Sequence, residues 1–296
     1  MRVLILGGGG MLGHKLWQVL RDRFDAWVTV RSSYAAYARY GLYDPERTLG
    51  GVDAANLDSV LQAVATVRPA VVVNAIGVVK QLPAARDPIA SLTLNALFPH
   101  RLAVLCRGVG ARLVHLSTDC VFSGRRGMYS EEDRPDPEDL YGQSKLLGEV
   151  TAAGALTLRT SIIGRELATA HGLVEWLLAN RGGRVRGYTH AIYSGLPTLV
   201  LARVIADLIE RHRDLEGLYH VSAEPVSKHD LLCLLCDAYG AAIDIEPWPD
   251  VRIDRSLDCS RFRAATGWLP PPWPELVQAM AADPTPYDEW RQTRAP

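Results

Sequence analysis

Hydrophobic residues follow two different spacings along the first two-thirds of the chain. Short apolar runs, typical of strands buried on both faces, occupy residues 2–6, 27–30, 70–75, 112–116 and 156–160. Between them, apolar residues recur every three or four positions, as in helices that cover a sheet, over residues 11–23, 57–67, 90–107, 140–150 and 198–211. This alternation predicts an α/β protein with a Rossmann-type doubly wound parallel sheet.

The pattern becomes less regular after Gly217. We therefore expect two domains, a first one over residues 1–162, to which residues 193–215 return, and a smaller C-terminal lobe over residues 163–296. Residues 283–296 are expected to form a loosely held tail. The elements expected in the last part of the chain are short strands at 218–221 and 242–245, a helix at 228–239 and a proline-rich stretch at 247–274.

Composition and charge exclude several classes of protein. Apolar residues make up 48% and charged residues 22% of the 296 residues, and the net charge is −1. This is an ordinary globular composition, without the excess of Lys and Arg that binding a nucleic acid requires. The apolar runs are too short or too interrupted to span a bilayer. We therefore expect a cytoplasmic protein with neither a nucleic-acid nor a membrane partner.

The five cysteines, at positions 106, 120, 233, 236 and 259, are an odd number in a long chain. That count does not suggest a secreted disulfide framework, so free thiols are expected. Cys233 and Cys236 form a C-x-x-C sequence, but it lies in a leucine-rich helical run without a second cysteine pair. We interpret both as small buried hydrophobic residues and expect no metal site.

A glycine-rich turn lies between the first strand and the first helix. Residues Gly7, Gly10 and Gly13 occupy a G-x-x-G-x-x-G spacing, and Met11 and Leu12 complete the turn. Residues without a Cβ let backbone N–H groups and a helix N-terminus approach a pyrophosphate. The turn therefore predicts a dinucleotide site, whereas a flexible turn is the alternative, since four adjacent glycines make the spacing partly automatic.

The second strand ends at Arg31. A site for NAD usually places a carboxylate here to bind the ribose 2′-hydroxyl, whereas an arginine suits the 2′-phosphate of NADP. The cofactor predicted is therefore NADPH, with NADH still possible. A solvated surface arginine is the alternative interpretation.

Tyr141 and Lys145 lie four residues apart, on one face of an expected helix. A nearby cation favours the phenolate, so we expect Lys145 to lower the pKa of Tyr141 toward a range useful for proton transfer. The alternative is a surface pair on the helix. Thr118 closes a buried strand at the edge of the sheet where open α/β folds bind ligands, and its hydroxyl can donate to the carbonyl oxygen that Tyr141 would protonate. A strand-ending turn would also favour a threonine there.

Taken together, these motifs resemble the extended short-chain dehydrogenase/reductases and, within them, the dTDP-4-dehydrorhamnose reductase family. The likeness covers nearly the whole chain and is more specific than any single motif. The matching residues, in chain order, are Gly7, Gly10, Gly13, Asp53, 74–77, Asn95, 117–124, Tyr141, Lys145, 159–161 and 195–198, with a weaker match at 255–258.

The resemblance implies roles for residues that the motifs alone do not assign. It implies a catalytic triad of Thr118, Tyr141 and Lys145, with Tyr141 and Lys145 also holding the nicotinamide ribose. Asp53 would contact the adenine, and the segment from Ala75 to Gly77 would line the cofactor. The first domain would then bind NAD(P), and the C-terminal lobe would bind the substrate. Asn95 would support Lys145.

The departures from the family pattern fall on the substrate side. Family members usually have an aromatic residue at the position of Cys120 and an Asn near His171, and they carry an Asp-Gln pair where this chain has residues 191–193. Asp119, Cys120 and His171 are expected to contact the substrate. The departures leave the reaction class intact and leave open whether the substrate is dTDP-4-dehydrorhamnose itself.

The function predicted is the NADPH-dependent reduction of a 4-keto (deoxy)sugar carried on a nucleoside diphosphate, by a chain that forms a possible homodimer. An epimerase, or a combined epimerase and reductase, is one alternative. In the latter, Cys120 would act as a proton-transfer acid, as in the similar GDP-fucose synthases, with His171 on the opposite face of the sugar. A non-catalytic subunit that binds NADP is the alternative of another class, since the regulatory subunit of methionine adenosyltransferase also resembles this family.

Overall fold

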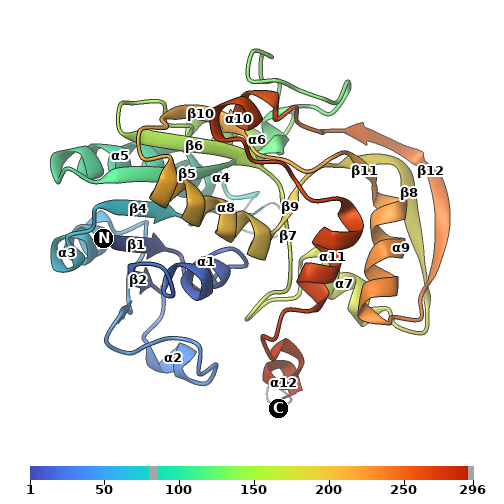
Figure 1. Cartoon of the computed structure of the whole chain (residues 1–296), viewed down its shortest axis with the longest axis horizontal. Coiled ribbons are helices and arrows are strands. Elements are labelled where there is room, and N and C mark those ends of the chain that lie inside the picture. The colour runs from blue at the N-terminus through green and yellow to red at the C-terminus, as the bar shows by residue number, and fades with distance from the viewer. Residues whose placement is uncertain (80–85, 293–296) are drawn as a thin grey trace.

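Seven strands form the central sheet of the computed structural model, which describes residues 1–79 and 86–292. Their order across the sheet is β10-β6-β5-β4-β1-β2-β3, and neighbouring strands are all parallel (Figure 1). The predicted Rossmann-type doubly wound sheet is confirmed. The strands are β1 (Arg2–Leu6), β2 (Asp25–Thr29), β3 (Thr48–Leu49), β4 (Val71–Asn74), β5 (Arg112–Thr118), β6 (Ala155–Thr160) and β10 (Gly217–His220).

The two faces of this sheet bury different side chains, because successive residues of a strand point to opposite faces. In β1, Val3 and Ile5 belong to one hydrophobic cluster, whereas Leu4 and Leu6 belong to another on the opposite face. This explains why the strands appear in the sequence as continuous apolar runs rather than as an alternation of apolar and polar residues.

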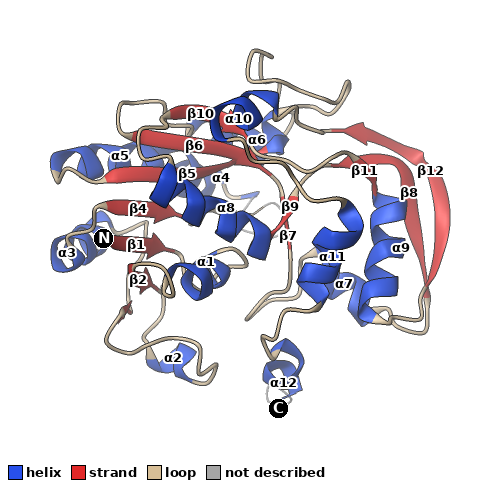
Figure 2. Ribbon diagram, in the orientation of Figure 1, coloured by secondary structure: helices blue, strands red, loops and turns tan. Residues whose placement is uncertain are grey.

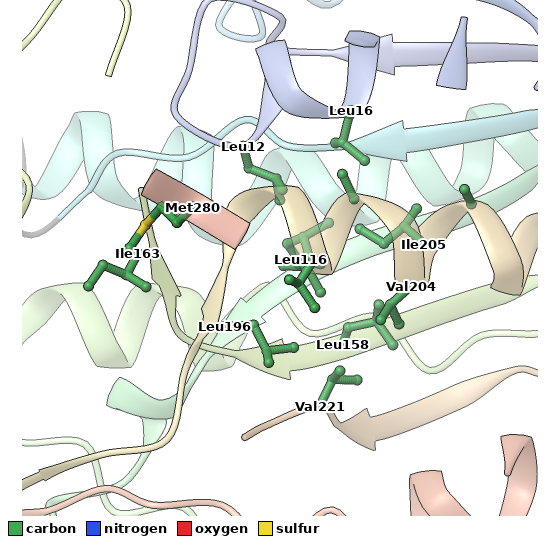
Figure 3. Close-up of a cluster of buried hydrophobic side chains, with 14 of the residues drawn as sticks. Leu12, Leu16, Leu116, Leu158, Ile163, Leu196, Val204, Ile205, Val221 and Met280 are labelled. Atoms are coloured by element: carbon green, nitrogen blue, oxygen red, sulfur yellow. The ribbon is translucent and has the colours of Figure 1, made fainter. Parts of the chain in front are cut away.

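Helices cover both faces of the sheet (Figure 2). α1 and α8 pack against each other on the first face, and Leu16 and Ile205 are part of the cluster between them (Figure 3). Helices α3 and α5 cover the second face. The helices outside the C-terminal region are α1 (Gly13–Leu20), α2 (Ala35–Ala38), α3 (Leu57–Val67), α4 (Pro88–Ser91), the π-helix η2 (Leu92–Leu97), α5 (Phe98–Gly108), the 3₁₀ turn η3 (Asp119–Val121), α6 (Leu140–Leu147), α7 (Leu173–Ala179) and α8 (Thr198–Arg211).

One helical stretch of the described residues, Pro88–Gly108, is long and apolar enough to cross a membrane by length and composition. In this fold its residues Phe98, Leu102 and Cys106 are buried in the cluster on the second face of the sheet. The apolar character of this stretch is therefore at least partly explained by packing against the sheet.

A smaller sheet lies beside the central one, with the strand order β11-β8-β12 (Figure 1). Its long strands β8 and β12 run parallel to each other, and α9 packs against β8. The division into domains 1–162 and 163–296 stays a prediction, although β10 pairs with β6 in the central sheet. The remaining elements are β7 (Ile162–Ile163), β8 (Arg184–Tyr193), β9 (Leu196–Pro197), β11 (Val226–Ser227), α9 (Lys228–Tyr239), β12 (Asp244–Asp254), α10 (Ser260–Thr266), α11 (Trp273–Ala281) and α12 (Tyr287–Gln292).

The end of the described chain is held firmly, so the expectation of a loose tail was wrong as far as Gln292; residues 293–296 lie outside the described part. Asp283 forms an ion pair with the buried Lys15 of α1. The Tyr287 hydroxyl hydrogen-bonds Nε2 of the buried His14 at 2.6 Å. Burial lowers the pKa of His14 to about 3, so its ring is neutral and donates from Nδ1 to the Gly10 carbonyl at 2.8 Å. The last helix therefore reaches the glycine-rich turn through one histidine.

Candidate active site

The glycine-rich turn packs so closely that a side chain would collide with its neighbours at several positions, and at Gly7 and Gly13 it would meet the backbone. Gly7 has a φ of +89°, and a Cβ there would lie 3.2 Å from the carbonyl group of Ala75. A Cβ on Gly13 would lie only 2.0 Å from the carbonyl oxygen of Gly7. The turn is also bonded to β2, because the N–H of Gly8 donates to the carbonyl of Thr29 at 2.7 Å. Glycine is therefore required at Gly7 and Gly13 to close the turn.

Helix α1 leaves its N-terminus available to an anion. The N-cap residue, Leu12, makes no side-chain hydrogen bond to the helix, and the first turn contains no acidic residue. The first N–H groups of a helix have no partners within it, and they attract negative charge. A Cβ on Gly10 would approach only the Gly7 carbonyl oxygen, at 3.4 Å, so this position is open on the other side. These residues fit the pyrophosphate of a dinucleotide.

Replacing Gly13 with Ala is expected to lower the free energy of unfolding by about 1–3 kcal/mol, because the new Cβ would overlap the Gly7 carbonyl oxygen. Replacing Gly10 with Ala is the matched control and is expected to cost less than about 1 kcal/mol, since its Cβ meets only ordinary contact distances. Urea unfolding of both variants without cofactor checks this. Equal losses of unfolding free energy in the two variants would show that the close approach of Gly13 to the Gly7 carbonyl oxygen does not require a glycine.

Arg31 and Asp53, both predicted to contact the adenosine half of the cofactor, are brought together beyond the end of β2. The guanidinium Nε of Arg31 lies 3.5 Å from a carboxylate oxygen of Asp53. The Arg31 side chain is 80% exposed and that of Asp53 is 37% exposed. Such an exposed ion pair contributes little to stability, so the Arg31 guanidinium is available to another anion at small cost.

The loop after β4 is held by Asn95, which lies on the buried side of the π-helix η2. The Asn95 side chain accepts from the Val78 N–H at 2.9 Å and donates to the Val78 carbonyl at 3.1 Å and to the Ser144 hydroxyl at 3.2 Å. A Cβ on Gly77 would lie 4.0 Å from the amine of Lys145. Asn95 thus connects the loop from Ala75 to Gly77 with the residue that precedes Lys145. π-helical turns of this kind are frequent at functional sites.

Thr118 lies at the carboxyl end of β5, where its side chain takes part in several hydrogen bonds. Its hydroxyl accepts from the Cys120 N–H and donates to the carboxylate of Asp119, both at 3.1 Å. The phenol of Tyr141 lies close enough to the Thr118 hydroxyl for that hydroxyl to affect the pKa of Tyr141. Helix α6, whose N-terminus is capped by the carboxylate of Asp139, carries Tyr141 to this position. The structure therefore brings Thr118 and Tyr141 together.

The electrostatics of Tyr141 and Lys145 differ from the expectation. Burial, followed by the influence of Cys120, raises the pKa of Tyr141, so the predicted lowering of this pKa was wrong. The amine of Lys145 donates to the Leu116 carbonyl at 2.6 Å, and burial lowers the pKa of Lys145 to about 8. Desolvation of the phenolate is the largest cause of the raised pKa of Tyr141. Tyr141 is consequently a protonated phenol near neutral pH, which suits a proton donor.

The residues expected to contact the substrate have different surroundings, and their role stays a prediction. Asp119 is buried beside Thr118, and burial, opposed mainly by Arg255, raises the pKa of its carboxyl group. Cys120 is partly buried against α6, since a Cβ on Gly142 would lie 2.3 Å from the Cys120 carbonyl oxygen. His171 is exposed and precedes Gly172, whose Cβ position is 2.8 Å from the Met11 side chain. Gly172 thus borders the glycine-rich turn, and His171 directly precedes it.

Comparison with known families agrees with this arrangement of residues. Residues 1–285 match the family model described as the RmlD substrate binding domain. The chain belongs to this RmlD family. The match covers the glycine-rich turn, the residues around Thr118 and the strands of the smaller sheet in one continuous stretch.

The proteins similar to this RmlD-family chain include a subunit of methionine adenosyltransferase and dTDP-4-dehydrorhamnose reductases. The chain is 28% identical over 256 residues, 80% of its length and 74% of the relative's, to methionine adenosyltransferase 2 subunit beta of Danio rerio. It is 39% identical over 149 residues, 50% of its length and 43% of the relative's, to dTDP-4-dehydrorhamnose reductase of Streptomyces griseus. The structure of dTDP-4-dehydrorhamnose reductase from Bacillus anthracis in complex with NADP has the same fold, with a TM-score of 0.78, 24% identity, and coverage of 94% of this chain and 98% of that one.

Two residues of this RmlD-family chain lie near Asp119 and Cys120: Lys228, which reasoning from the sequence missed, and Tyr193, which it placed on the substrate side within residues 191–193 without assigning it a role. Lys228 begins α9 and interacts electrostatically with both residues. Tyr193 ends β8 and is buried. For Lys228 the available signal was composition, because the chain contains only four lysines among its 32 basic residues. Nothing in the local sequence places either residue beside β5, since the contact depends on how the two sheets meet.

Proposed function

We propose that this chain reduces the keto group of a 4-keto (deoxy)sugar carried on a nucleoside diphosphate, with NADPH as the preferred reductant. The observation that carries the proposal is the protonated phenol of Tyr141, which lies close to the Thr118 hydroxyl at the carboxyl end of β5. The glycine-rich turn that fits a dinucleotide lies at the same edge of the sheet, after β1. A proton donor and a cofactor site are the two parts that carbonyl reduction needs.

Each residue of the site has a separate role in the proposed reduction. When bound, the nicotinamide cofactor supplies the hydride. Tyr141 donates its proton to the carbonyl oxygen of the sugar, and the Thr118 hydroxyl orients that oxygen. The ammonium of Lys145, whose pKa of about 8 keeps it largely charged at pH 7, stabilises the phenolate that remains on Tyr141. Gly7, Gly13 and the N-terminus of α1 would hold the pyrophosphate.

A panel of nucleoside-diphosphate 4-keto sugars tests this function directly. The purified chain is mixed with NADPH and each sugar, and the loss of NADPH absorbance is followed. Consumption of one NADPH for each molecule of a keto sugar supports the proposal. Conversion of a sugar without net consumption of NADPH would instead identify an epimerase, and no conversion of any member would overturn the reductase function.

The preference for NADPH is expected to depend on Arg31. Replacing Arg31 with Ala should weaken the binding of NADPH about 10-fold and leave that of NADH within about 2-fold, because only the 2′-phosphate loses a charge-assisted contact. Fluorescence titration with both cofactors measures this, and Arg39→Ala, at an exposed arginine on the neighbouring α2 segment, is the control. Equal weakening of both cofactors would mean that Arg31 acts through the structure alone.

A second candidate is a cofactor-binding partner subunit without catalytic activity. It is favoured by the relative from Danio rerio, which is named as a subunit and covers 80% of this chain. The complete set of Thr118, Tyr141 and Lys145 favours the enzyme. Co-elution with a purified methionine adenosyltransferase catalytic subunit, in a chain that consumes no NADPH with any keto sugar, would support the subunit. The cytoplasmic location and the homodimer expected from the sequence stay predictions.

A further inference from the structure

Lys228 is fixed at the junction of the two sheets. β11 pairs with β8 in an antiparallel register that sets Val226 opposite Tyr193. Helix α9 begins directly after β11, with Ser227 as its N-cap and Lys228 as its first residue. The Lys228 amine consequently lies over the Tyr193 ring, 5.2 Å from its centroid. Its position is set by the backbone pairing of two elements and not by a free surface loop.

The surroundings of Lys228 lack a partner for its hydrogen-bond donors. The half-buried ammonium interacts electrostatically with Asp119 and Cys120, the residues that follow Thr118. Within the described part of the chain, however, neither a hydrogen bond nor an ion pair of its amine is found. An ammonium group has three donors, and partial burial without protein acceptors leaves fewer of them to water, which is costly. In agreement, burial lowers the pKa of Lys228.

The other cations near the site are already engaged. Lys145 donates to the Leu116 carbonyl, and Arg255 donates to the Phe122 carbonyl at 2.8 Å. Arg159 forms a bidentate ion pair with Glu149. These groups therefore gain little from a ligand, whereas Lys228 gains an acceptor.

The Tyr193 hydroxyl is a second group without a satisfactory partner. Tyr193 is 8% exposed, and its hydroxyl is buried without a hydrogen bond of acceptable geometry in the described structure, although Ser161 lies close enough to affect its pKa. A buried hydroxyl usually finds a partner. The ring that lies under the Lys228 amine thus carries another group that a ligand could satisfy.

We propose that Lys228, together with the Tyr193 hydroxyl, binds oxygen substituents of the sugar ring and so determines which sugar the chain accepts. The proposal rests on the reductase function and names its sugar-binding residues. A sugar hydroxyl suits this position better than a diphosphate does, because the neighbouring carboxyl group of Asp119 would repel a second anion when ionised and accepts hydrogen bonds from hydroxyl groups. Thr118, which orients the reacting carbonyl, directly precedes Asp119.

Calorimetric titration with a nucleotide sugar and with its free nucleoside diphosphate distinguishes a contact of Lys228 with the sugar from a contact with the diphosphate. The ligands are dTDP-rhamnose, UDP-glucose and GDP-mannose, each compared with its free nucleoside diphosphate in the presence of NADP⁺. In Lys228→Met, the affinity for the nucleotide sugar that the unmodified chain binds should fall about 10- to 100-fold, as for the loss of a charged hydrogen bond. The affinity for the free nucleoside diphosphate should change less than about 3-fold. Lys228→Arg should recover part of the loss.

Two further variants control this experiment. Arg101→Met removes one positive charge from an exposed position on α5 and should leave all affinities unchanged. Tyr193→Phe, which keeps the ring under the amine, should weaken the nucleotide sugar about 3- to 10-fold and serves if Lys228→Met does not fold.

Three other results would overturn the sugar-binding role of Lys228 or the reductase function on which it rests. Equal losses for the nucleotide sugar and the free nucleoside diphosphate would place Lys228 on the diphosphate and overturn the proposal, as would unchanged affinities in both Lys228→Met and Tyr193→Phe. If the unmodified chain binds none of the three nucleotide sugars and reduces none of the keto-sugar panel, the reductase function fails and the proposal with it.

Discussion

Replacing Tyr141 with Phe is expected to lower turnover of the keto sugar by about 10²- to 10⁴-fold, the range over which general acid catalysis contributes. The ring and its packing remain, but the proton donor is removed. Because burial raises the pKa of Tyr141, the phenol is protonated at neutral pH in the unmodified chain and the full effect should be visible there. The affinity for NADPH should change less than about 3-fold. NADPH consumption at saturating keto sugar measures the first quantity and fluorescence titration the second.

Tyr188→Phe is the matched control for this substitution. Tyr188 lies on β8 with 37% of its surface exposed, far along the strand from Tyr193, so loss of its hydroxyl should not change turnover. A Tyr141→Phe variant that turns over within 3-fold of the unmodified chain would remove Tyr141 from the mechanism. Loss of NADPH binding with the turnover would instead indicate that Tyr141 mainly holds the cofactor.

Replacing Asp283 with Ala is expected to lower the free energy of unfolding by about 3–5 kcal/mol. The Lys15 side chain is 2% exposed and the Asp283 side chain 9% exposed, so the substitution leaves an uncompensated cation in the interior. Lys15 also donates to the Thr285 hydroxyl at 2.8 Å and to the Gln18 side chain at 2.7 Å, and these bonds cannot balance its charge. The midpoint and slope of urea unfolding at pH 7 measure the loss.

The pair of Arg125 and Glu138 provides a control of the same chemistry on the surface. Its side chains are 79% and 53% exposed, so Glu138→Ala should cost less than about 1 kcal/mol. If Asp283→Ala were no more harmful than Glu138→Ala, burial of the pair with Lys15 would not contribute to stability as argued.

The parts of the fold that the sequence could predict are those with local signals. The sequence shows β1, β4 and β5 as apolar runs because each strand is buried on both faces. It shows the turn between β1 and α1 as a run of glycines because a Cβ is excluded there. Thr118 could be placed for the same reason, at the end of a buried run.

Other features depend on contacts between distant segments or on opposing effects. β12 extends through Pro247 and Pro249, which suggested a break, and an edge strand tolerates them. The anchoring of Asp283 requires Lys15, 268 residues earlier, and the position of Lys228 requires the junction of two sheets. The pKa of Tyr141 depends on the depth of burial, which a spacing of four residues does not reveal.

The contacts of the last helix have a consequence for the order in which a ribosome produces this protein. Lys15 and His14 leave the ribosome about 270 residues before their partners Asp283 and Tyr287. Until then, the ammonium of Lys15 and the imidazole of His14 need water as their hydrogen-bonding partner, so this surface of α1 cannot be buried. The packing around α1 is therefore completed only when Asp283 and Tyr287 dock on it.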